Sequence, residues 1–295
     1  MWYKGLFQDQ RKYRQVNGIW SKGDICGNDN MRIYDEQGGT CFHERSQIPG
    51  THSFFDTQLL YHHLGHLFKK ISPQVILDLG CGDGRATRWF LENTQANIIA
   101  LDGVMNSLIR LQKQYLDGQN SFAQRVCLIH SNIDRLPIAD EAVDFIWSFE
   151  VLGFLENDFI RGYKECVRVV KKNGMFVHAD RDKDFGLLHE LLMRGPQSML
   201  DVADKQSKIL EFCGNDMMSS AVKTRAEMMQ IIKDHGLKCL ETLNVPFYSF
   251  IVSYLKSQNQ YTQEINLSAQ KLSKAFISAA EYCGLNRSTI FVTQK

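Results

Sequence analysis

The feature that most constrains this chain is an apolar run that ends in three alternating glycines. Residues 75–79 read Val-Ile-Leu-Asp-Leu, which is short, branched and mostly apolar, as expected of a buried parallel strand. Gly80, Gly82 and Gly84 follow, and glycine lets a backbone turn sharply and approach a ligand closely. A helix after these glycines would point its positive end at that ligand. The segment therefore predicts a nucleotide-type cofactor site.

The spacing of the glycines separates two kinds of site. A dinucleotide-binding loop has the spacing G-x-G-x-x-G, which would place its third glycine at Arg85. Asp78 lies within the strand, and a buried carboxylate is costly without a partner. A ligand with a carboxylate for the loop amides and an ammonium for Asp78 meets both demands. An amino-acid moiety is such a ligand, whereas a pyrophosphate is not.

A second acidic residue ends the next predicted strand. Residues 96–101 read Ala-Asn-Ile-Ile-Ala-Leu, and Asp102 follows them. An acid at this place commonly accepts hydrogen bonds from two ribose hydroxyls. A helix N-cap is the alternative for a lone aspartate after a strand. At this spacing after the glycine loop we expect ribose binding.

Four segments, in order along the chain, resemble the motifs of the class I S-adenosylmethionine-dependent methyltransferases. They read LDLGCGDG at 77–84, HSNIDRLPI at 130–138, AVDFIWSFEVL at 142–152 and YKECVRVVKKNGM at 163–175. Together they cover about residues 75–180. The resemblance implies S-adenosylmethionine as the cofactor and S-adenosylhomocysteine as its product.

The resemblance also implies a set of cofactor-binding positions. These are Asp78, Gly80, Cys81, Gly82, Gly84, Asp102, Gly103, Asn132, Ile133, Ser148 and Phe149. Asn132 stands where the family often has Asp, and an amide still donates and accepts hydrogen bonds to adenine. We expect the Cys81 side chain to pack as a small hydrophobe. No metal is expected, because His62 and His66 are spaced as ligands but have no evident third partner.

The predicted fold is α/β, with a Rossmann-like, seven-stranded, mostly parallel sheet, helices on both faces and one antiparallel closing strand. Residues 1–55 are aromatic and broken by glycines, and we predict that they form a lid or accessory segment. Simple packing of these aromatics on the core is the alternative. Residues 56–295 are the predicted methyltransferase domain, with a helical insert at about 181–222.

Other elements follow from hydrophobic periodicity. Helices are expected over 56–70, with Asp56 as N-cap, and over 157–172, with two lysines at its end. After the insert we expect a helix over 224–234 and another over 264–282, which lies between two strands. Those strands are predicted at 237–243 and 288–293.

Charge and hydropathy narrow the partners. The 295 residues carry a formal net charge of +1 without a run of Lys or Arg, which disfavours DNA or a generic RNA as substrate. No apolar run approaches the ~20 residues of a membrane span, and the amino terminus lacks the apolar core of a signal peptide. The eight scattered cysteines are then expected as free thiols. We predict a cytoplasmic protein with neither a DNA nor a membrane partner.

The activity that the resemblance implies is methyl transfer to a small-molecule acceptor, by in-line displacement at the sulfonium methyl. Alternatives are a protein or RNA methyltransferase and a non-methylating S-adenosylmethionine-binding protein. Glu150, His178 and Asp180 lie where strands four and five end, His178 late within strand five, and a general base would lie in this region. For Glu150 we favour helix capping, and for His178 a structural role, so no catalytic residue is assigned.

Overall fold

The computed structural model describes residues 2–8, 12–23, 29–38, 52–117, 121–206, 208–213, 216–247 and 286–295. The helix predicted over 264–282 lies outside these residues. In the described ranges, no helix is both long and apolar enough to span a bilayer.

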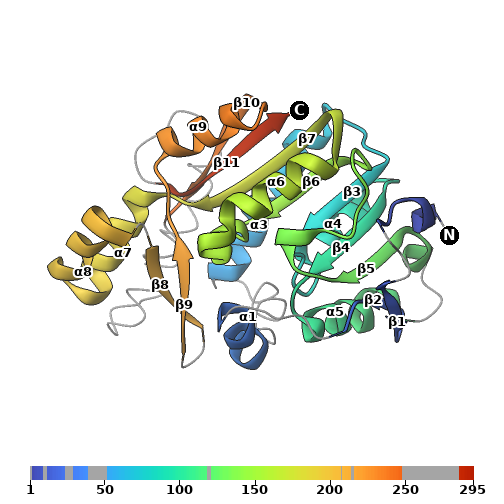
Figure 1. The fold of residues 1–295 in the computed structure, drawn as a ribbon, viewed down its shortest axis with the longest axis horizontal. Helices are drawn as coiled ribbons and strands as arrows, with labels where there is room; N and C mark the ends of the chain where they lie inside the picture. Colours follow the sequence, from blue (N-terminus) through green and yellow to red (C-terminus); the bar gives the residue numbers. More distant parts are fainter. Residues whose placement is uncertain are drawn as a thin grey trace.

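A nine-stranded sheet in the order β1-β2-β5-β4-β3-β6-β7-β11-β10 runs through the centre of the fold (Figure 1). Its strands are β1 (Arg14–Val16), β2 (Ile19–Ser21), β3 (Val75–Leu79), β4 (Asn97–Asp102), β5 (Val126–His130), β6 (Val143–Phe149), β7 (Val170–Arg181), β10 (Lys238–Pro246) and β11 (Asn286–Gln294). Strands β5, β4, β3, β6 and β7 are parallel, and β11 is antiparallel to both neighbours. The predicted Rossmann-like sheet is therefore confirmed in its seven strands from β3 onwards.

The other two strands come from the amino-terminal segment and were not foreseen. The hairpin β1–β2 joins the sheet through a parallel pairing of β2 with β5. Aromatic rings pack together here: Tyr3 and Trp20 lie edge to face with centroids 6.2 Å apart, and Phe7 and Trp20 are tilted with centroids 5.4 Å apart. Tyr3 belongs to the same buried cluster as Ile129 of β5. This part of residues 1–55 therefore packs on the edge of the core.

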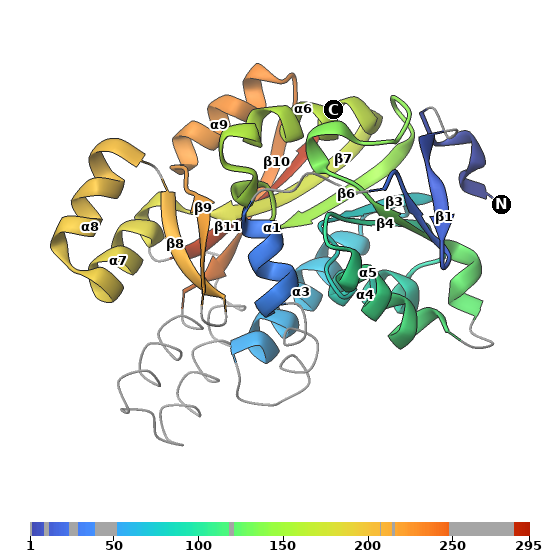
Figure 2. The same cartoon turned by 60° about the horizontal axis from the view of Figure 1, so that its bottom comes forward.

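Helices cover both faces of the sheet (Figures 1 and 2). The α-helices are α1 (Asp29–Ile33), α3 (His52–Phe68), α4 (Arg85–Asn93), α5 (Met105–Leu111), α6 (Phe159–Val169), α7 (Lys183–Arg194), α8 (Pro196–Asp201) and α9 (Arg225–Asp234). Shorter 3₁₀ or π turns are η1 (Trp2–Gly5), η3 (Tyr34–Gly38), η4 (Gln112–Leu116), η5 (Ser121–Arg125), η6 (Ile133–Arg135), η7 (Leu152–Asp158) and η8 (Val202–Gln206).

The alternation of side chains along β3 explains the two layers. Ile76 belongs to a buried cluster with Leu60 of α3 and Phe90 of α4. Leu77 belongs to a second cluster, with Tyr163 of α6. Successive residues of a strand point to opposite faces, so an apolar run such as 75–79 serves both layers at once.

Two helix boundaries differ from the prediction. Helix α3 begins at His52, so Asp56 lies inside it and accepts a hydrogen bond from Arg287 Nη1 at 2.8 Å instead of capping the helix. Helix α6 ends at Val169, and Lys171 pairs with Asp144 at 2.7 Å instead of occupying the last helical turn. In both cases the charged side chain pairs with a residue that is distant in sequence, and not with the helix end that the local pattern indicated.

The insert after β7 is only half helical. Helices α7 and α8 fill its first half as predicted, but β8 (Lys208–Cys213) and β9 (Asp216–Ala221) form an antiparallel hairpin in its second half. The prediction of helix there was wrong, because leucines and methionines do not distinguish the two periodicities over so short a segment. Ile209 is buried and Leu210 is exposed, which is the alternation of a strand.

Helix α9 confirms the predicted helix over 224–234 and offers a test of its N-terminus. Thr224 Oγ1 accepts a hydrogen bond from Glu227 N at 3.1 Å, and the Glu227 carboxylate accepts one from Thr224 N at 2.7 Å. We predict that Thr224→Ala lowers the free energy of unfolding by about 1 kcal/mol, measured by urea denaturation, because the Glu227 N–H of the first helical turn loses its acceptor. Thr224→Ser keeps the hydroxyl and should stay near wild type, so an equal loss in both variants would contradict the cap.

Candidate active site

A cavity of about 370 Å³ lies at the carboxyl ends of the parallel strands. Loops after β3, β4, β5 and β6 form one side of it. Helix α1 with η3 and the hairpin β8–β9 contribute the rest of the wall. Its walls thus join segments from the beginning, the middle and the insert of the chain.

The glycine loop places two of its three glycines, Gly80 and Gly82, in the lining of this cavity. Gly80, Gly82 and Gly84 have φ of 67°, 55° and 95°, which L side chains rarely adopt. A Cβ atom on Gly80 would lie 2.5 Å from Val151, and one on Gly84 would lie 2.8 Å from Leu111. These two glycines permit close packing of the protein itself.

Gly82 differs from them. Among the described atoms, a Cβ on Gly82 would have only Tyr34 Oη within 4 Å, at 3.7 Å, and both residues line the cavity. The backbone of Gly82 therefore faces a space that a ligand can approach and that a larger side chain would occupy. This is the cradle that an amino-acid moiety requires.

Asp102, at the end of β4, holds the loop in place. Its Oδ2 accepts a hydrogen bond from Gly82 N at 2.7 Å, and its Oδ1 accepts one from Val104 N at 2.8 Å. It does not cap α5, whose N-cap is Val104. Burial raises the pKa of Asp102 to about 6, against the effect of the two N–H donors. Each oxygen keeps a lone pair for a ribose hydroxyl.

Eight of the predicted cofactor-binding residues line the cavity: Gly80, Cys81, Gly82, Asp102, Gly103, Asn132, Ile133 and Phe149. Asp78, Gly84 and Ser148 lie behind its wall. Asp78 is 2% exposed, and its Oδ2 accepts a hydrogen bond from Thr87 Oγ1 at 2.5 Å. We expected the ammonium of the ligand to partner this carboxylate, whereas in the structure the Thr87 hydroxyl does so. Burial raises the pKa of Asp78 to about 7, although Thr87 opposes the shift. Contact of the lining residues with a cofactor stays a prediction.

Glu150 lines the cavity but is fully engaged by cations. Its carboxylate forms ion pairs with Arg181 Nη1 and, at 2.9 Å, with Arg287 Nη2. It accepts hydrogen bonds from Arg287 Nε at 3.0 Å and from Ser288 Oγ at 2.7 Å. Burial opposes the effect, yet Arg181 and Arg287 hold the pKa of Glu150 at about 2. Glu150 therefore links the ends of β6, β7 and β11 as an ion network, instead of capping a helix or acting as a base.

His178 and Asp180 lie under the cavity, outside its lining. His178 has no exposed side-chain surface, its Nε2 lies 3.3 Å from the Tyr163 hydroxyl, and burial lowers its pKa to about 3. Asp180 Oδ1 accepts a hydrogen bond from Gly153 N at 2.7 Å, and burial raises its pKa to about 7. The structural role favoured for His178 agrees with this position.

Sequence reasoning missed six residues that complete the cavity away from the loops after β3, β4, β5 and β6. They are Asn30, Met31 and Tyr34 from α1 and η3, and Arg181, Glu211 and Met218 from β7 and the hairpin. Figure 2 shows α1 beside β9. Both elements are far from the glycine loop in sequence. Aromatic composition predicted a covering segment within 1–55, but no local pattern distinguishes residues 30–34.

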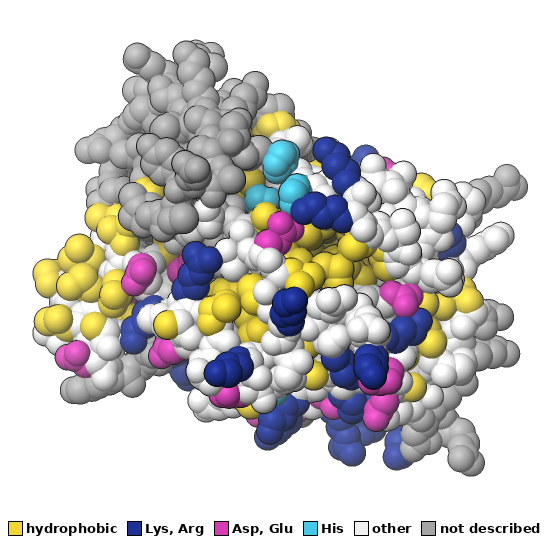
Figure 3. All heavy atoms as spheres, turned by 90° about the horizontal axis from the view of Figure 1, so that it is seen from above, with side chains coloured by type: hydrophobic (Ala, Val, Ile, Leu, Met, Phe, Trp, Pro, Cys, Tyr) yellow, Lys and Arg dark blue, Asp and Glu magenta, His cyan; other side chains and the backbone are white. Residues whose placement is uncertain are grey.

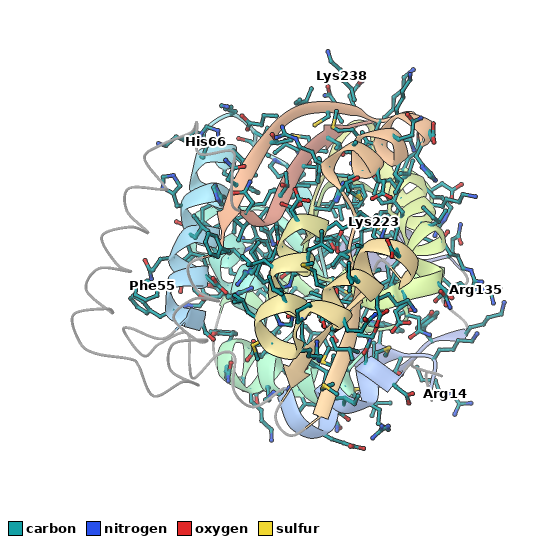
Figure 4. The ribbon with its side chains drawn as sticks, turned by 90° about the vertical axis from the view of Figure 1, so that its left-hand side faces the viewer. Arg14, Phe55, His66, Arg135, Lys223 and Lys238 are labelled. Atoms are coloured by element: carbon teal, nitrogen blue, oxygen red, sulfur yellow. The ribbon has the colours of Figure 1, made fainter. Side chains whose placement is uncertain are left out.

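His66, one of the two candidate metal ligands, has other partners. His66 Nε2 lies 3.3 Å from Glu241 Oε1 and 3.2 Å from Lys70 Nζ, at the outer end of α3 (Figure 4). Figure 3 shows histidines on this face next to acidic and basic side chains. In the described part of the chain, no group of three or more His, Cys, Asp or Glu is arranged to hold a metal ion.

The charge of the cavity suits a cationic ligand. The acidic residues of its lining are Asp83, Asp102, Asp134, Glu150, Asp158 and Glu211, whereas the basic ones are Arg85 and Arg181. S-adenosylmethionine carries a sulfonium and an ammonium against one carboxylate. Together with the Gly82 cradle and the Asp102 carboxylate, this donor and acceptor set fits that cofactor.

Comparison with known proteins agrees with the geometry. Residues 77–178 match the protein family described as Methyltransferase domain. The matched segment includes the glycine loop, Asp102 and the exit of β6. The chain contains a class I S-adenosylmethionine-dependent methyltransferase domain. S-adenosylmethionine is the cofactor of this family. The match begins after α1 and ends before the insert.

Relatives resemble the chain over part of its length. Malonyl-acyl-carrier-protein O-methyltransferase of Methylovorus sp. (strain MP688) is 30% identical over 117 residues, 39% of this chain and 39% of that protein. The protein of the same name from Nitrosospira multiformis is 32% identical over 120 residues, 37% and 39% of the two chains. The chain thus spans about two fifths of the length of the curated relatives it matches.

A solved structure extends the likeness in fold. A SAM-dependent methyltransferase from Methanosarcina mazei superposes with a TM-score of 0.52 at 13% identity and covers 79% of this chain and 96% of its own. At this identity the likeness concerns the fold alone.

The raised pKa of Asp102 predicts a pH-dependent cofactor affinity. Ribose hydroxyls donate to the ionised carboxylate, whereas below pH about 6 the free protein holds Asp102 protonated. We predict that S-adenosylhomocysteine binding, measured by calorimetry, weakens as pH falls from 7.5 to 5, by up to about tenfold per pH unit below 6. Asp102→Asn cannot titrate and should bind weakly with a flatter profile. An unchanged slope in that variant would remove Asp102 from the ribose site.

Proposed function

We propose that this chain transfers the methyl group of S-adenosylmethionine to a small-molecule acceptor bound in the same cavity. The observation that supports the proposal is the size and make-up of the cavity, which measures about 370 Å³. Helix α1 and the hairpin β8–β9, which meet through Asn30, contribute wall residues in addition to the glycine loop. Cavities of a few hundred Å³ hold ligands of metabolite size.

We assign the acceptor to the part of the cavity that is lined by apolar side chains and a paired arginine. Phe149, Phe154 and Met218 line it, together with Arg181. Arg181 is held on both sides, because Glu211 accepts from its Nε at 2.8 Å and from its Nη2 at 2.7 Å while Glu150 pairs with Nη1. These contacts fix the shape of the acceptor end before an acceptor binds.

Within this cavity the Gly82 and Gly103 backbones, Asp102 and Asn132 would hold the cofactor. S-adenosylmethionine supplies a methyl group on a positively charged sulfur, which leaves as a neutral thioether when the nucleophilic atom of the acceptor bonds to the methyl carbon. The protein aligns the two reactants and excludes water, and alignment alone is worth up to ~7–11 kcal/mol.

None of the three base candidates is available to take a proton from the acceptor. Glu150 is saturated by arginines, and His178 and Asp180 lie outside the lining. We therefore infer an acceptor whose nucleophilic atom carries a free electron pair near neutral pH, with any proton lost to solvent. Relatives named for methyl transfer to malonyl-acyl-carrier-protein support a carboxylate oxygen as one acceptor to test. The cytoplasmic location and the lack of a DNA partner stay predictions.

The direct experiment uses methyl-labelled S-adenosylmethionine and the full chain. We expect label in the small-molecule fraction when a deproteinised metabolite extract is added. Label on RNA or on the side chains of added protein would favour a macromolecular acceptor, and cofactor binding without turnover in any fraction would favour a non-methylating binder.

Gly82→Val tests whether the loop cradles the cofactor. A branched side chain would occupy the space beside Tyr34 Oη, so we predict at least about a hundredfold loss of S-adenosylhomocysteine affinity in calorimetry. Gly236→Val is the matched control, because Gly236 also has positive φ, 72°, but no described atom within 4 Å of a Cβ. Both variants carry backbone strain of about 1–2 kcal/mol, so equal affinity in the two would contradict the cradle.

A further inference from the structure

The Asn30 side chain connects the two elements that complete the cavity. Asn30 lies on α1 and is 5% exposed. Its Nδ2 donates to Ser219 O at 2.7 Å, and its Oδ1 accepts from Ser219 N at 2.8 Å. The same Nδ2 donates to Phe154 O at 3.1 Å. The amide thus pairs with the backbone of β9 as a neighbouring strand would, and it reaches η7 as well.

The place of Ser219 in the hairpin makes this pairing specific. Ser219 lies opposite Leu210 in the β8–β9 pair. Because both backbone groups of Ser219 bond to Asn30, they are directed away from β8, at the outer edge of the hairpin. The adjacent residue, Met218, lines the cavity. One side chain of the amino-terminal segment therefore covers the strand that carries part of the acceptor wall.

The same short segment carries two side chains to the cofactor loops. A Cβ on Gly103 would lie 2.3 Å from Met31 Cε, so Met31 packs directly on the backbone that follows Asp102. Tyr34 Oη is the atom nearest to a Cβ on Gly82. The position of α1 thus determines how Met31 and Tyr34 cover both loops.

We propose that Asn30 is a positioning residue that holds α1 and β9 together over the bound cofactor, so that cofactor and product leave only after the Asn30–Ser219 pair separates. The proposal rests on the proposed function. Separation leaves Ser219 N, Ser219 O and Asn30 Oδ1 without the partners that they have in the pair. Buried polar groups without partners are costly. Since the hairpin also carries Glu211 and Met218, the pair couples the cofactor side of the cavity to its acceptor side.

The test is the dissociation rate of S-adenosylhomocysteine from the full chain, measured by stopped-flow displacement. Asn30→Asp keeps the shape of the side chain but turns a carboxylate oxygen toward Ser219 O and Phe154 O, with Glu156 Oε1 also within 3.4 Å of that position. We expect dissociation at least about tenfold faster, together with a lower thermal midpoint, because an unpaired buried carboxylate is costly.

Two further variants make the test specific. Ser219→Pro removes the Ser219 N–H, which donates to Asn30 Oδ1. Ser219 lies on the outer edge of the hairpin, where proline is tolerated, and this variant should also speed dissociation. Asn17→Asp makes the same charge change in the exposed turn between β1 and β2 and should leave the rate unchanged.

The outcomes separate this proposal from the proposed function. A wild-type chain that binds no S-adenosylhomocysteine would overturn both. Wild-type binding with unchanged dissociation in Asn30→Asp and Ser219→Pro would overturn the role of Asn30 alone. A loss of thermal stability without faster dissociation would likewise reduce Asn30 to a structural contact. If Asn30→Asp does not fold, Ser219→Pro decides.

Discussion

The hydrogen bond from Gly82 N to Asp102 Oδ2 is the interaction on which the site depends. It joins the loop after β3 to the end of β4 at 2.7 Å and holds a backbone with positive φ in the one shape that leaves the cradle open. Asp102 reaches that position because β3 and β4 are parallel neighbours, with Leu79 opposite Leu101. The strand pairing therefore sets the geometry of the cradle, and the carboxylate keeps it.

A second constraint acts at the ends of β6, β7 and β11. Glu150, Arg181 and Arg287 are each at most 13% exposed in their side chains, and each compensates the charge of another. Removing one partner from such a group leaves an unpaired buried charge, which costs several kcal/mol. This network explains why Glu150, although it lines the cavity, serves its shape and not proton transfer. Polar residues at strand ends are thus divided between holding the site and facing the ligand.

The cavity wall combines segments that lie inside the matched methyltransferase family with segments that lie outside it. The matched methyltransferase family covers the strands that hold the cofactor loops, whereas α1 and the hairpin lie outside that match. Both outlying elements are short, and they meet through side-chain-to-backbone hydrogen bonds more than through a large apolar core. Contacts of that kind open at lower free energy than a packed core does, which suits elements that must admit ligands.

The sequence by itself determined the parallel sheet, the glycine loop and the place of Asp102. Each of these follows from a local pattern: an apolar run, three alternating glycines and an acid after the next strand. Only the tertiary structure decided that Thr87 partners Asp78, that arginines saturate Glu150, and that Asn30 meets Ser219 across 189 positions of the chain. Such pairs join residues that no periodicity links. Helix α1 and the hairpin β8–β9 meet through such a distant pair.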